Sequence, residues 1–374
     1  MSRNSILNER HLALGADLTA VSWNDMPLPW DYSTKLLDEV IATRQTAGLY
    51  DVSALNSVDV TGPDAESVLD QLVCIDITKL KPGTARLSAE VDENGAICDD
   101  IMVIRDAPDV FRLSHGSGKT PEHLAKLAAG KNVKVEPDLD AHVLSLQGPK
   151  SLEVLAPHVG FKLADLPYFK HVKTTIFGCD AFIARGGYSG EQGYEIYCKS
   201  KDAVLIWDKV LEAGAPFGVI PASWHALEVT RMEAALLFYP FEMLEGDTTP
   251  WEINMGWGVD VDKEGDYIGK QAVLASRGKE RFKQAGMVVT MPGKAPAAGD
   301  KIYQDGKEVG VITSAIFSEY LMLSLALVHL TKETAVAGTV LEIKSDGKSY
   351  AGRVTPTPFY DPMRLRTHPE KLLP

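Results

Sequence analysis

The chain is predicted to fold as an α+β protein that ends in a small β-barrel. It has 374 residues, 45% of them hydrophobic, and this length favours two or three domains over one simple core. The first third reads as strands and helices in the order β-α-β-β-β-α-β, which is an α+β signature. Beyond about residue 281 the pattern changes to short strands joined by the turn pairs Asp305-Gly306 and Asp346-Gly347, which is typical of a barrel.

A helix and a strand open the α+β region. Ser33 or Thr34 can cap the helix, which is expected to end near Gly48 and to bury an apolar face made of Leu36, Leu37, Val40 and Ile41. The strand that follows alternates in character over residues 57–60.

The next helix opens at Gly62-Pro63-Asp64 and carries the apolar residues Val68, Leu69, Leu72 and Val73. Strands are then predicted at 86–91, 97–105 and 110–115, a helix at 121–129 and a strand at 133–135. These elements complete the α+β order.

The middle of the chain continues with a strand at 143–147 and a helix that ends near residue 155. A strand pair follows, interrupted by the glycine-rich stretch 186–190. Two more helices are predicted, at residues 203–212 and 221–237.

Composition and charge exclude several classes of function. The formal net charge is -13 and no run of Lys and Arg offers a basic surface, so nucleic acid is not an expected partner. No stretch approaches the roughly 20 apolar residues that span a bilayer, and residues 1–13 lack the apolar core of a signal peptide. We therefore expect a cytoplasmic protein that does not bind membranes; a monomer is compatible with the sequence.

No metal site is expected. The four cysteines lie in apolar, strand-like contexts without any CxxC pair and are predicted to be reduced packing residues: Cys74, Cys98, Cys179 and Cys198. The histidines show neither HxH nor HExxH spacing.

Asp99 and Asp100 place two carboxylates inside an otherwise apolar strand. Successive residues of a strand point to opposite faces, so one of the two is expected to be buried. A buried carboxylate needs partners or a shifted pKa, and it often marks a site for a polar or cationic group. A hydrogen-bonded turn pair at a hairpin explains the same residues equally well.

Residues 186–195 combine four glycines with two tyrosines and two glutamates. The glycines allow the backbone to approach a flat ligand, on which Tyr188 could stack. Glu195 could pair with the adjacent N–H donors of a pterin. The spacing is not the GxGxxG of a dinucleotide site, and a hairpin connection is the simpler interpretation of these residues alone.

Three further positions are ambiguous by themselves. Arg231 lies on a predicted helix, either as a surface residue or as a clamp for a carboxylate or carbonyl. His115 ends a strand, where a lone histidine is more often structural. Trp257 lies in a non-helical segment near glycine, where rings line clefts as often as they fill cores.

Read together, these segments resemble the glycine-cleavage T-protein family of folate-dependent aminomethyltransferases and its demethylase relatives. The matching stretches extend over nearly the whole chain, at residues 23–28, 47–53, 94–100, 146–150, 185–195, 231–234 and 358–360. The resemblance implies a three-domain cloverleaf with a ferredoxin-like domain. It also implies two interleaved α+β domains within 1–280, one inserted at about 55–140, and a barrel at 281–374.

The resemblance also implies tetrahydrofolate as the cofactor, and site residues to hold it. Glu195 matches the glutamate that grips the pterin and Tyr188 the tyrosine beside it. Arg231 matches an arginine that helps to hold the cofactor, and Asp100 the catalytic aspartate. Trp257 is expected to contribute to the wall of the same pocket.

Three departures from the family pattern bear on the substrate. Ala54-Leu55 stands where the family has His-Met, Leu87 replaces a tyrosine, and His115 replaces an asparagine. A site built around polar partners rarely tolerates their loss, which argues against the aminomethyl-lipoyl reaction.

We therefore predict a tetrahydrofolate-dependent demethylase that moves a methyl group from a small donor, a methoxy-aromatic acid, to N5 of tetrahydrofolate. His115 would protonate the departing phenolate. The alternatives are an aminomethyltransferase of the glycine-cleavage type, a demethylase of a sulfonium compound such as dimethylsulfoniopropionate, and a folate-binding factor without turnover.

Overall fold

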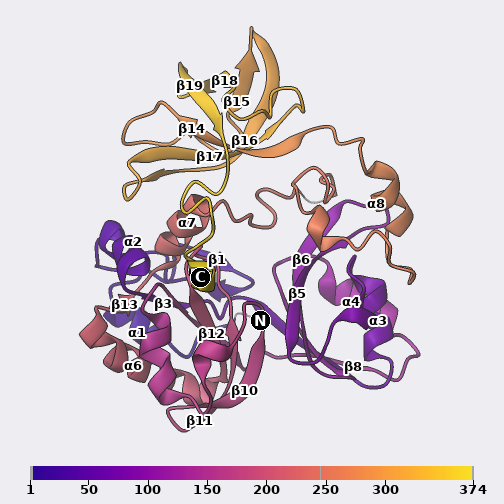
Figure 1. The fold of residues 1–374 in the computed structure, drawn as a ribbon, viewed down its shortest axis with the longest axis vertical. Coiled ribbons are helices and arrows are strands. Elements are labelled where there is room, and N and C mark those ends of the chain that lie inside the picture. The colour runs from indigo at the N-terminus through magenta and orange to yellow at the C-terminus, as the bar shows by residue number, and fades with distance from the viewer. Residues whose placement is uncertain (1–2, 245, 373–374) are drawn as a thin grey trace.

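The computed structural model describes residues 3–244 and 246–372, which form three β-sheet bodies beside a short β1–β2 hairpin (Ser22–Trp23 and Met26–Pro27). Figure 1 shows a six-stranded sheet at lower left, a five-stranded sheet at lower right and a closed barrel above them. None of the described helices is long and apolar enough to cross a bilayer.

The five-stranded sheet follows the predicted β-α-β-β-β-α-β order. Its strands lie in the order β5-β6-β7-β4-β8, and helices α3 and α4 pack together beside them. The bounds are β4 Asn56–Thr61, α3 Ala65–Leu72, β5 Thr84–Val91, β6 Ile97–Ala107, β7 Val110–His115, α4 Thr120–Ala128 and β8 Lys134–Pro137. Val68, Leu69 and Leu72 of α3 are fully buried against the sheet, as their spacing indicates.

The six-stranded sheet has the order β10-β11-β12-β9-β3-β13, and the five-stranded sheet interrupts it in sequence between β3 and β9. Its strands are β3 Gly48–Asp51, β9 Ala141–Gln147, β10 His171–Ile176, β11 Cys179–Arg185, β12 Gly193–Lys199 and β13 Ile220–Pro221. This interruption agrees with the expected insertion at about 55–140, although the exact domain limits stay a prediction.

Helices cover both faces of the six-stranded sheet. Helix α6 (Ser200–Gly214), with α1 (Asn8–Ala13) and α5 (Ser151–Leu155), lies on the side that buries Leu144 and Ile196, while α2 (Leu36–Gln45) and α7 (Trp224–Glu233) lie on the side of Val143. Because side chains alternate along a strand, Glu195 and Tyr197 point away from α6. This alternation sends Glu195 toward the space between the two sheets.

Six antiparallel strands close the barrel in the order β14-β17-β16-β15-β18-β19. They are β14 Lys283–Val289, β15 Lys301–Gln304, β16 Lys307–Ser318, β17 Leu323–Leu330, β18 Val340–Ser345 and β19 Lys348–Thr355, and α8 (Lys270–Ser276) precedes them. Both Asp-Gly pairs form the predicted turns, with φ of 50° and 80° at Asp305-Gly306.

Two predicted helix boundaries are wrong. Helix α2 begins at Leu36 behind the N-cap residue Lys35, and Gly48 starts β3 instead of ending the helix. The helix predicted at 221–237 covers only Trp224–Glu233, because Ser223 caps its start and Ala235 takes a left-handed φ of 52° beyond its end. The residues after that turn leave the helix and line a cavity.

Candidate functional site

One cavity of about 670 Å³ lies between the two sheets, the segments 235–243 and 253–257 and the near strands of the barrel. Five of the six predicted site residues line it: Asp100, His115, Tyr188, Glu195 and Trp257. They come from β6, β7, the β11–β12 loop, β12 and a 3-10 helix at Gly256–Gly258, so the fold brings together residues that are far apart in sequence.

The two neighbouring aspartates have separate environments. Asp99 is fully buried and accepts hydrogen bonds from the backbone N–H groups of Gly118 at 3.0 Å and Asp100 at 2.9 Å. Asp100 points to the other face of β6, into the cavity. The expectation that one carboxylate of the pair is buried is confirmed: Asp99 is fully buried, whereas Asp100 is partly exposed at the cavity.

Asp100 has a pKa close to neutral pH. Burial, and after it the negative charge of Asp99, raises the pKa of Asp100 to about 7. A group that titrates near the working pH can give or accept a proton with little penalty. The pair therefore supplies a proton-transfer group from one residue and a structural anchor from the other.

His115 is held by the same anchor. Its Nδ1 lies 3.4 Å from Oδ2 of Asp99, and its ring is buried at the wall of the cavity. Asp99 also receives the N–H of Gly116 at 3.3 Å, so this carboxylate orders the loop that follows β7. Because Asp99 engages Nδ1, Nε2 is the nitrogen of His115 available to a ligand.

Glu195 is a carboxylate in an apolar setting. Burial raises its pKa, and the Tyr197 hydroxyl, which donates to it at 3.0 Å, opposes that rise. Among the described residues it takes part in no ion pair, so its charge lacks a cationic partner within the protein. A ligand with adjacent N–H donors would satisfy it.

Tyr188 helps to build the cavity wall from the glycine-rich loop. Its hydroxyl donates to the carbonyl of Leu237, which belongs to the segment that follows α7, and burial raises its pKa well above the usual range. Gly187 of that loop has a φ of 153°, and a Cβ there would collide with the Gln147 side chain, so the loop needs glycine at this position.

Arg231 is the predicted site residue that the structure does not place at the cavity surface. Its guanidinium is fully buried and paired with Glu228 and Glu242, at 2.5 and 3.2 Å. It also donates at 3.2 Å to the carbonyl of Leu236, a lining residue. In this structure Arg231 therefore holds the wall in place instead of facing the cavity.

Trp257 stands at the rim, where 59% of its surface is exposed. Trp23 and Phe238 also line the cavity and contact each other, with ring centroids 5.3 Å apart. Phe238 and Tyr168 were missed from the sequence because both lie in irregular segments without periodicity. Tyr197 could have been found, since it stands two residues from Glu195 on the same face of β12.

The departures from the family pattern converge on this cavity. Leu55, Leu87 and His115 all line it, whereas Ala54 is buried in the core. Within this single site a leucine thus replaces a tyrosine and an imidazole replaces an asparagine, whereas Leu55 replaces another apolar residue, a methionine.

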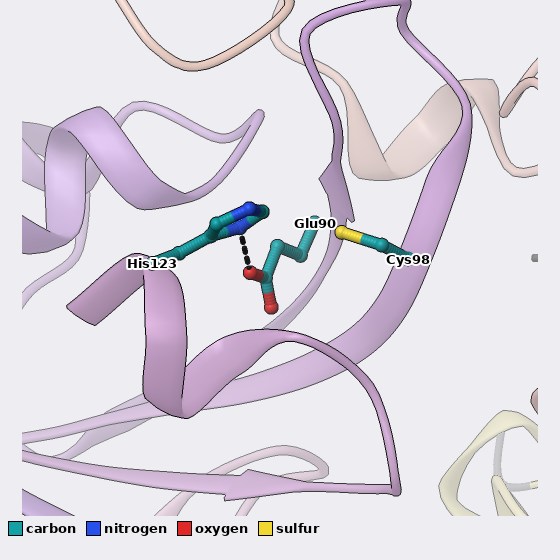
Figure 2. A group of neighbouring side chains, drawn as sticks. All are labelled: Glu90, Cys98 and His123. Carbon is teal, nitrogen blue, oxygen red and sulfur yellow. Dashed lines mark hydrogen bonds and ion pairs between the residues drawn. The ribbon is translucent and has the colours of Figure 1, made fainter. Parts of the chain in front are cut away.

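A second cluster of titratable residues, Glu90, Cys98 and His123, lies outside the lining of the cavity. Figure 2 shows Cys98 pointing toward Glu90, whose carboxylate contacts His123 of α4. The His123 Nδ1 and Glu90 Oε1 atoms are 2.5 Å apart, whereas two ligands of one tetrahedral zinc ion lie about 3.3 Å apart for bonds of about 2.0 Å. Burial, together with Glu90 and Asp99, raises the pKa of the Cys98 thiol. The geometry is that of an ion pair beside a neutral thiol.

All four cysteines are buried and free. Their state agrees with the expectation that they serve as reduced packing residues.

Comparisons with known proteins cover nearly the whole length of the chain. Residues 7–263 match the model of the GCVT N-terminal domain, and residues 283–361 match that of the glycine cleavage T-protein C-terminal barrel domain. The chain is 40% identical over 373 residues to the heme-dependent oxidative N-demethylase gamma subunit of Ectopseudomonas mendocina, with 97% of each chain covered.

Two aminomethyltransferases are also similar. The protein of Thermotoga petrophila is 34% identical over 361 residues, which cover 95% of this chain and 96% of that protein. The crystal structure of the glycine cleavage system aminomethyltransferase T from Bartonella henselae superposes with a TM-score of 0.88 at 28% identity, over 96% of this chain and 99% of that one. These matches confirm the predicted α+β fold with a C-terminal barrel.

Proposed function

Because the chain belongs to the glycine-cleavage T-protein family, a family of one-carbon transferases, we propose that it loads a one-carbon unit derived from an N-methyl group onto tetrahydrofolate. The observation that carries the proposal is a single cavity lined both by Asp100, with a pKa of about 7, and by Glu195, which has no ion-pair partner among the described residues. The relative at 40% identity, named as a subunit of an oxidative N-demethylase, favours nitrogen as the atom that releases the carbon.

The cavity residues fit a folate. The Glu195 carboxylate would accept the adjacent N–H donors of the pterin, which would compensate the burial that raises its pKa. Tyr188 and Trp257 would flank the ring system as walls, and Arg231 would act only by holding Leu236. Tetrahydrofolate, when bound, supplies N5 and N10 as nucleophiles.

Asp100 and His115 would move the protons. Joining formaldehyde to tetrahydrofolate to give 5,10-methylenetetrahydrofolate and water takes two protons from nitrogen and delivers two to oxygen, so the protein must shuttle protons without net gain or loss. Ionised Asp100 would accept a proton and return it. The Nε2 atom of His115 would stabilise the negative charge that develops on the formaldehyde oxygen.

An oxidising partner follows from this assignment. An N-methyl group must lose two electrons before its carbon reaches the level of formaldehyde, and no described residue of this chain is an evident redox centre. We therefore propose that a partner chain performs the oxidation and that this protein works as one subunit of an assembly. The expectation of a monomer has no support from the similarity to a named gamma subunit.

Demethylation of a methoxy-aromatic acid remains a second candidate, favoured by the apolar and aromatic lining at Leu55, Leu87 and Phe238. In that reaction an intact methyl group would pass to N5 and His115 would protonate the phenolate. The two candidates leave different folate products.

The identity of the folate product tests the proposal. The protein is incubated with tetrahydrofolate and, separately, with low formaldehyde, methoxybenzoates, dimethylsulfoniopropionate and an aminomethylated carrier protein. We expect formation of 5,10-methylenetetrahydrofolate from formaldehyde well above the uncatalysed rate, and above the rate with Asp100→Asn. Formation of 5-methyltetrahydrofolate from a methoxybenzoate would favour the second candidate, and release of ammonia from the carrier would identify an aminomethyltransferase.

A further inference from the structure

Two buried carboxylates face each other on the side of the five-stranded sheet that points away from the cavity. Glu90 of β5 and Asp99 of β6 are direct partners in the antiparallel register, and both side chains are fully buried. Residues directly opposite each other on two strands share one face of the sheet, where like charges destabilise the pair. Both carboxylates therefore need hydrogen-bond donors at close range.

Thr120, the first residue of α4, lies between these two carboxylates. Its hydroxyl donates to Oε2 of Glu90 at 2.5 Å and lies 3.4 Å from Oδ2 of Asp99. A hydroxyl has one proton to donate, and the shorter distance assigns it to Glu90. The other oxygen of Glu90 contacts His123, three residues further along α4 (Figure 2). Glu90 thus holds the first turn of α4, and the acceptor sites of Asp99 remain for other donors.

The other donors to Asp99 come from the loop that joins His115 to Thr120. The backbone N–H groups of Gly116 and Gly118 donate to its carboxylate at 3.3 and 3.0 Å, and Nδ1 of His115 lies 3.4 Å from it. A Cβ on Gly118 would lie 1.8 Å from a backbone oxygen of β6, so the loop packs directly on that strand. The loop, residues 116–119, is short, and a displacement at its Thr120 end therefore reaches the His115 end.

We propose that Thr120 is a positioning residue for the one-carbon transfer. By holding Glu90 it fixes the start of α4, and through the loop and Asp99 it sets the orientation of the His115 ring. The inference rests on the proposed function, in which Nε2 of His115 acts on the formaldehyde oxygen. Thr120 is fully buried and does not line the cavity, so it acts on turnover only through other residues.

Turnover and folate binding of Thr120→Val in the full chain test the inference. Valine keeps the shape of the side chain but leaves Glu90 without its hydroxyl donor. We expect kcat with formaldehyde and tetrahydrofolate to fall about tenfold, the equivalent of one hydrogen bond. Folate affinity should stay nearly unchanged, because Glu195 lies on the other sheet. Thr120→Ser, which keeps the hydroxyl, should restore most of the turnover, and Thr175→Val, at an exposed position of β10, is the matched control.

The same substitution in a His115→Ala background separates positioning from a general structural effect. If Thr120 acts through His115, Thr120→Val should lower kcat little once the imidazole is gone, because residues of one network are not additive. An equal fold-loss in both backgrounds would overturn the inference, as would an unchanged kcat in Thr120→Val. Thr120→Ala makes the same test if Thr120→Val does not fold.

Nitrogen NMR of the histidine rings gives a readout that does not depend on turnover. The resonances of His115, identified by their absence in His115→Ala, should shift in Thr120→Val and stay near their wild-type positions in Thr120→Ser. Unshifted resonances in Thr120→Val would overturn the inference even if kcat falls. Failure of the wild-type protein to form 5,10-methylenetetrahydrofolate would overturn the proposed function, and the resonances alone would then decide whether Thr120 orients the His115 ring.

Discussion

At the scale of single residues, strand geometry gives two adjacent aspartates different environments and different roles. Asp99 receives backbone N–H groups and contacts His115, so its charge is satisfied within the protein. Asp100 has no such set of donors and faces the cavity, where burial and the charge of Asp99 raise its pKa to about 7. A one-residue slip of β6 would exchange these roles, because it would reverse which side chain faces the cavity.

Asp100 should give the reaction its dependence on pH. If the ionised carboxylate starts the proton transfers, kcat should rise as pH increases through about 7, the pKa of Asp100. Asp100→Asn should lower kcat by about 100-fold or more and remove this inflection, since a positioned acid–base group contributes about 10²–10⁴-fold. A pH–rate profile of the variant that keeps the same inflection would assign the titration to another group.

The same variant should be more stable than the wild type at high pH. The pKa of Asp100 is higher in the folded state than its ordinary value of 3.8, so folding favours the protonated form, and stability falls as pH rises from that value to about 7, above which the loss is complete. Asp100→Asn removes this cost. Urea unfolding at pH 5 and pH 8 should show a larger gain in midpoint for the variant at pH 8.

Glu195 should decide folate binding. Glu195→Ala should abolish tetrahydrofolate binding measured by calorimetry. A carboxylate that accepts two hydrogen bonds from adjacent N–H donors contributes a charge-assisted interaction and also fixes the orientation of the pterin. Glu153→Ala, which removes an exposed carboxylate of α5 paired with Lys150, is the control and should bind normally. Unchanged affinity in Glu195→Ala would remove Glu195 from the site.

His115 should act on turnover more than on binding. His115→Ala is expected to lower kcat for the one-carbon donor far more than it weakens folate binding, because Asp99 engages Nδ1 and leaves Nε2 free to act on the reacting group. Equal losses in kcat and in folate affinity would make His115 a binding residue.

At the scale of elements, regular segments were predictable from the sequence and irregular ones were not. The strand that carries Asp100 was predicted at 97–105, and the alternation of side chains along a strand predicts that Asp99 and Asp100 face opposite sides. The segment after α7 reaches the cavity because Ala235 adopts a left-handed backbone conformation. No pattern in the sequence predicts this conformation for an alanine. For the same reason Phe238 was missed, and the partner of Arg231 across that turn, Glu242, was not foreseen.

The packing of α4 against β5 should depend on pH. Glu90 is fully buried, its carboxylate contacts His123 of α4 at 2.5 Å, and this contact raises the pKa of His123. A raised folded-state pKa means that the stabilisation is fully present below about 6.5, the ordinary value, and is lost as pH rises through the higher folded pKa. Glu90→Gln should lower the free energy of unfolding at pH 6 by about 1.5–3 kcal/mol, the value of a hydrogen bond to a charged group.

The measurement for this element is the unfolding free energy of Glu90→Gln and the wild type between pH 5 and pH 9. The difference between them should narrow toward high pH. A difference that is constant over the whole range would mean that His123 is not charged in the folded protein. Glu93→Gln, which alters an exposed pair with Lys126, is a suitable control.

At the scale of the whole molecule, one buried arginine joins the bodies around the site. Arg44 of α2 pairs with Glu233 of α7 at 2.7 Å and with Glu191 of the glycine-rich loop at 3.1 Å, and it lies 4.0 Å from the centre of the Tyr360 ring. Glu233 in turn accepts a hydrogen bond from Ser318 of the barrel at 2.5 Å. The barrel, the helices α2 and α7 that cover the six-stranded sheet, and the loop that carries Tyr188 therefore meet at a single charge network.

Removal of this arginine should loosen the molecule and the site together. Arg44→Met would leave Glu233 buried without a cation, and breaking a buried pair in this way costs about 3–5 kcal/mol. Arg10→Met, which breaks an exposed pair with Asp208, should cost about 1 kcal/mol or less. Urea unfolding should therefore separate the two variants clearly.

Because Arg44 also donates to the carbonyl of Ser189 at 2.8 Å, next to Tyr188, Arg44→Met should weaken folate binding under conditions in which it is still folded. Normal folate affinity in the folded variant would mean that the loop is positioned by Gln147 and Leu237 without help from the network.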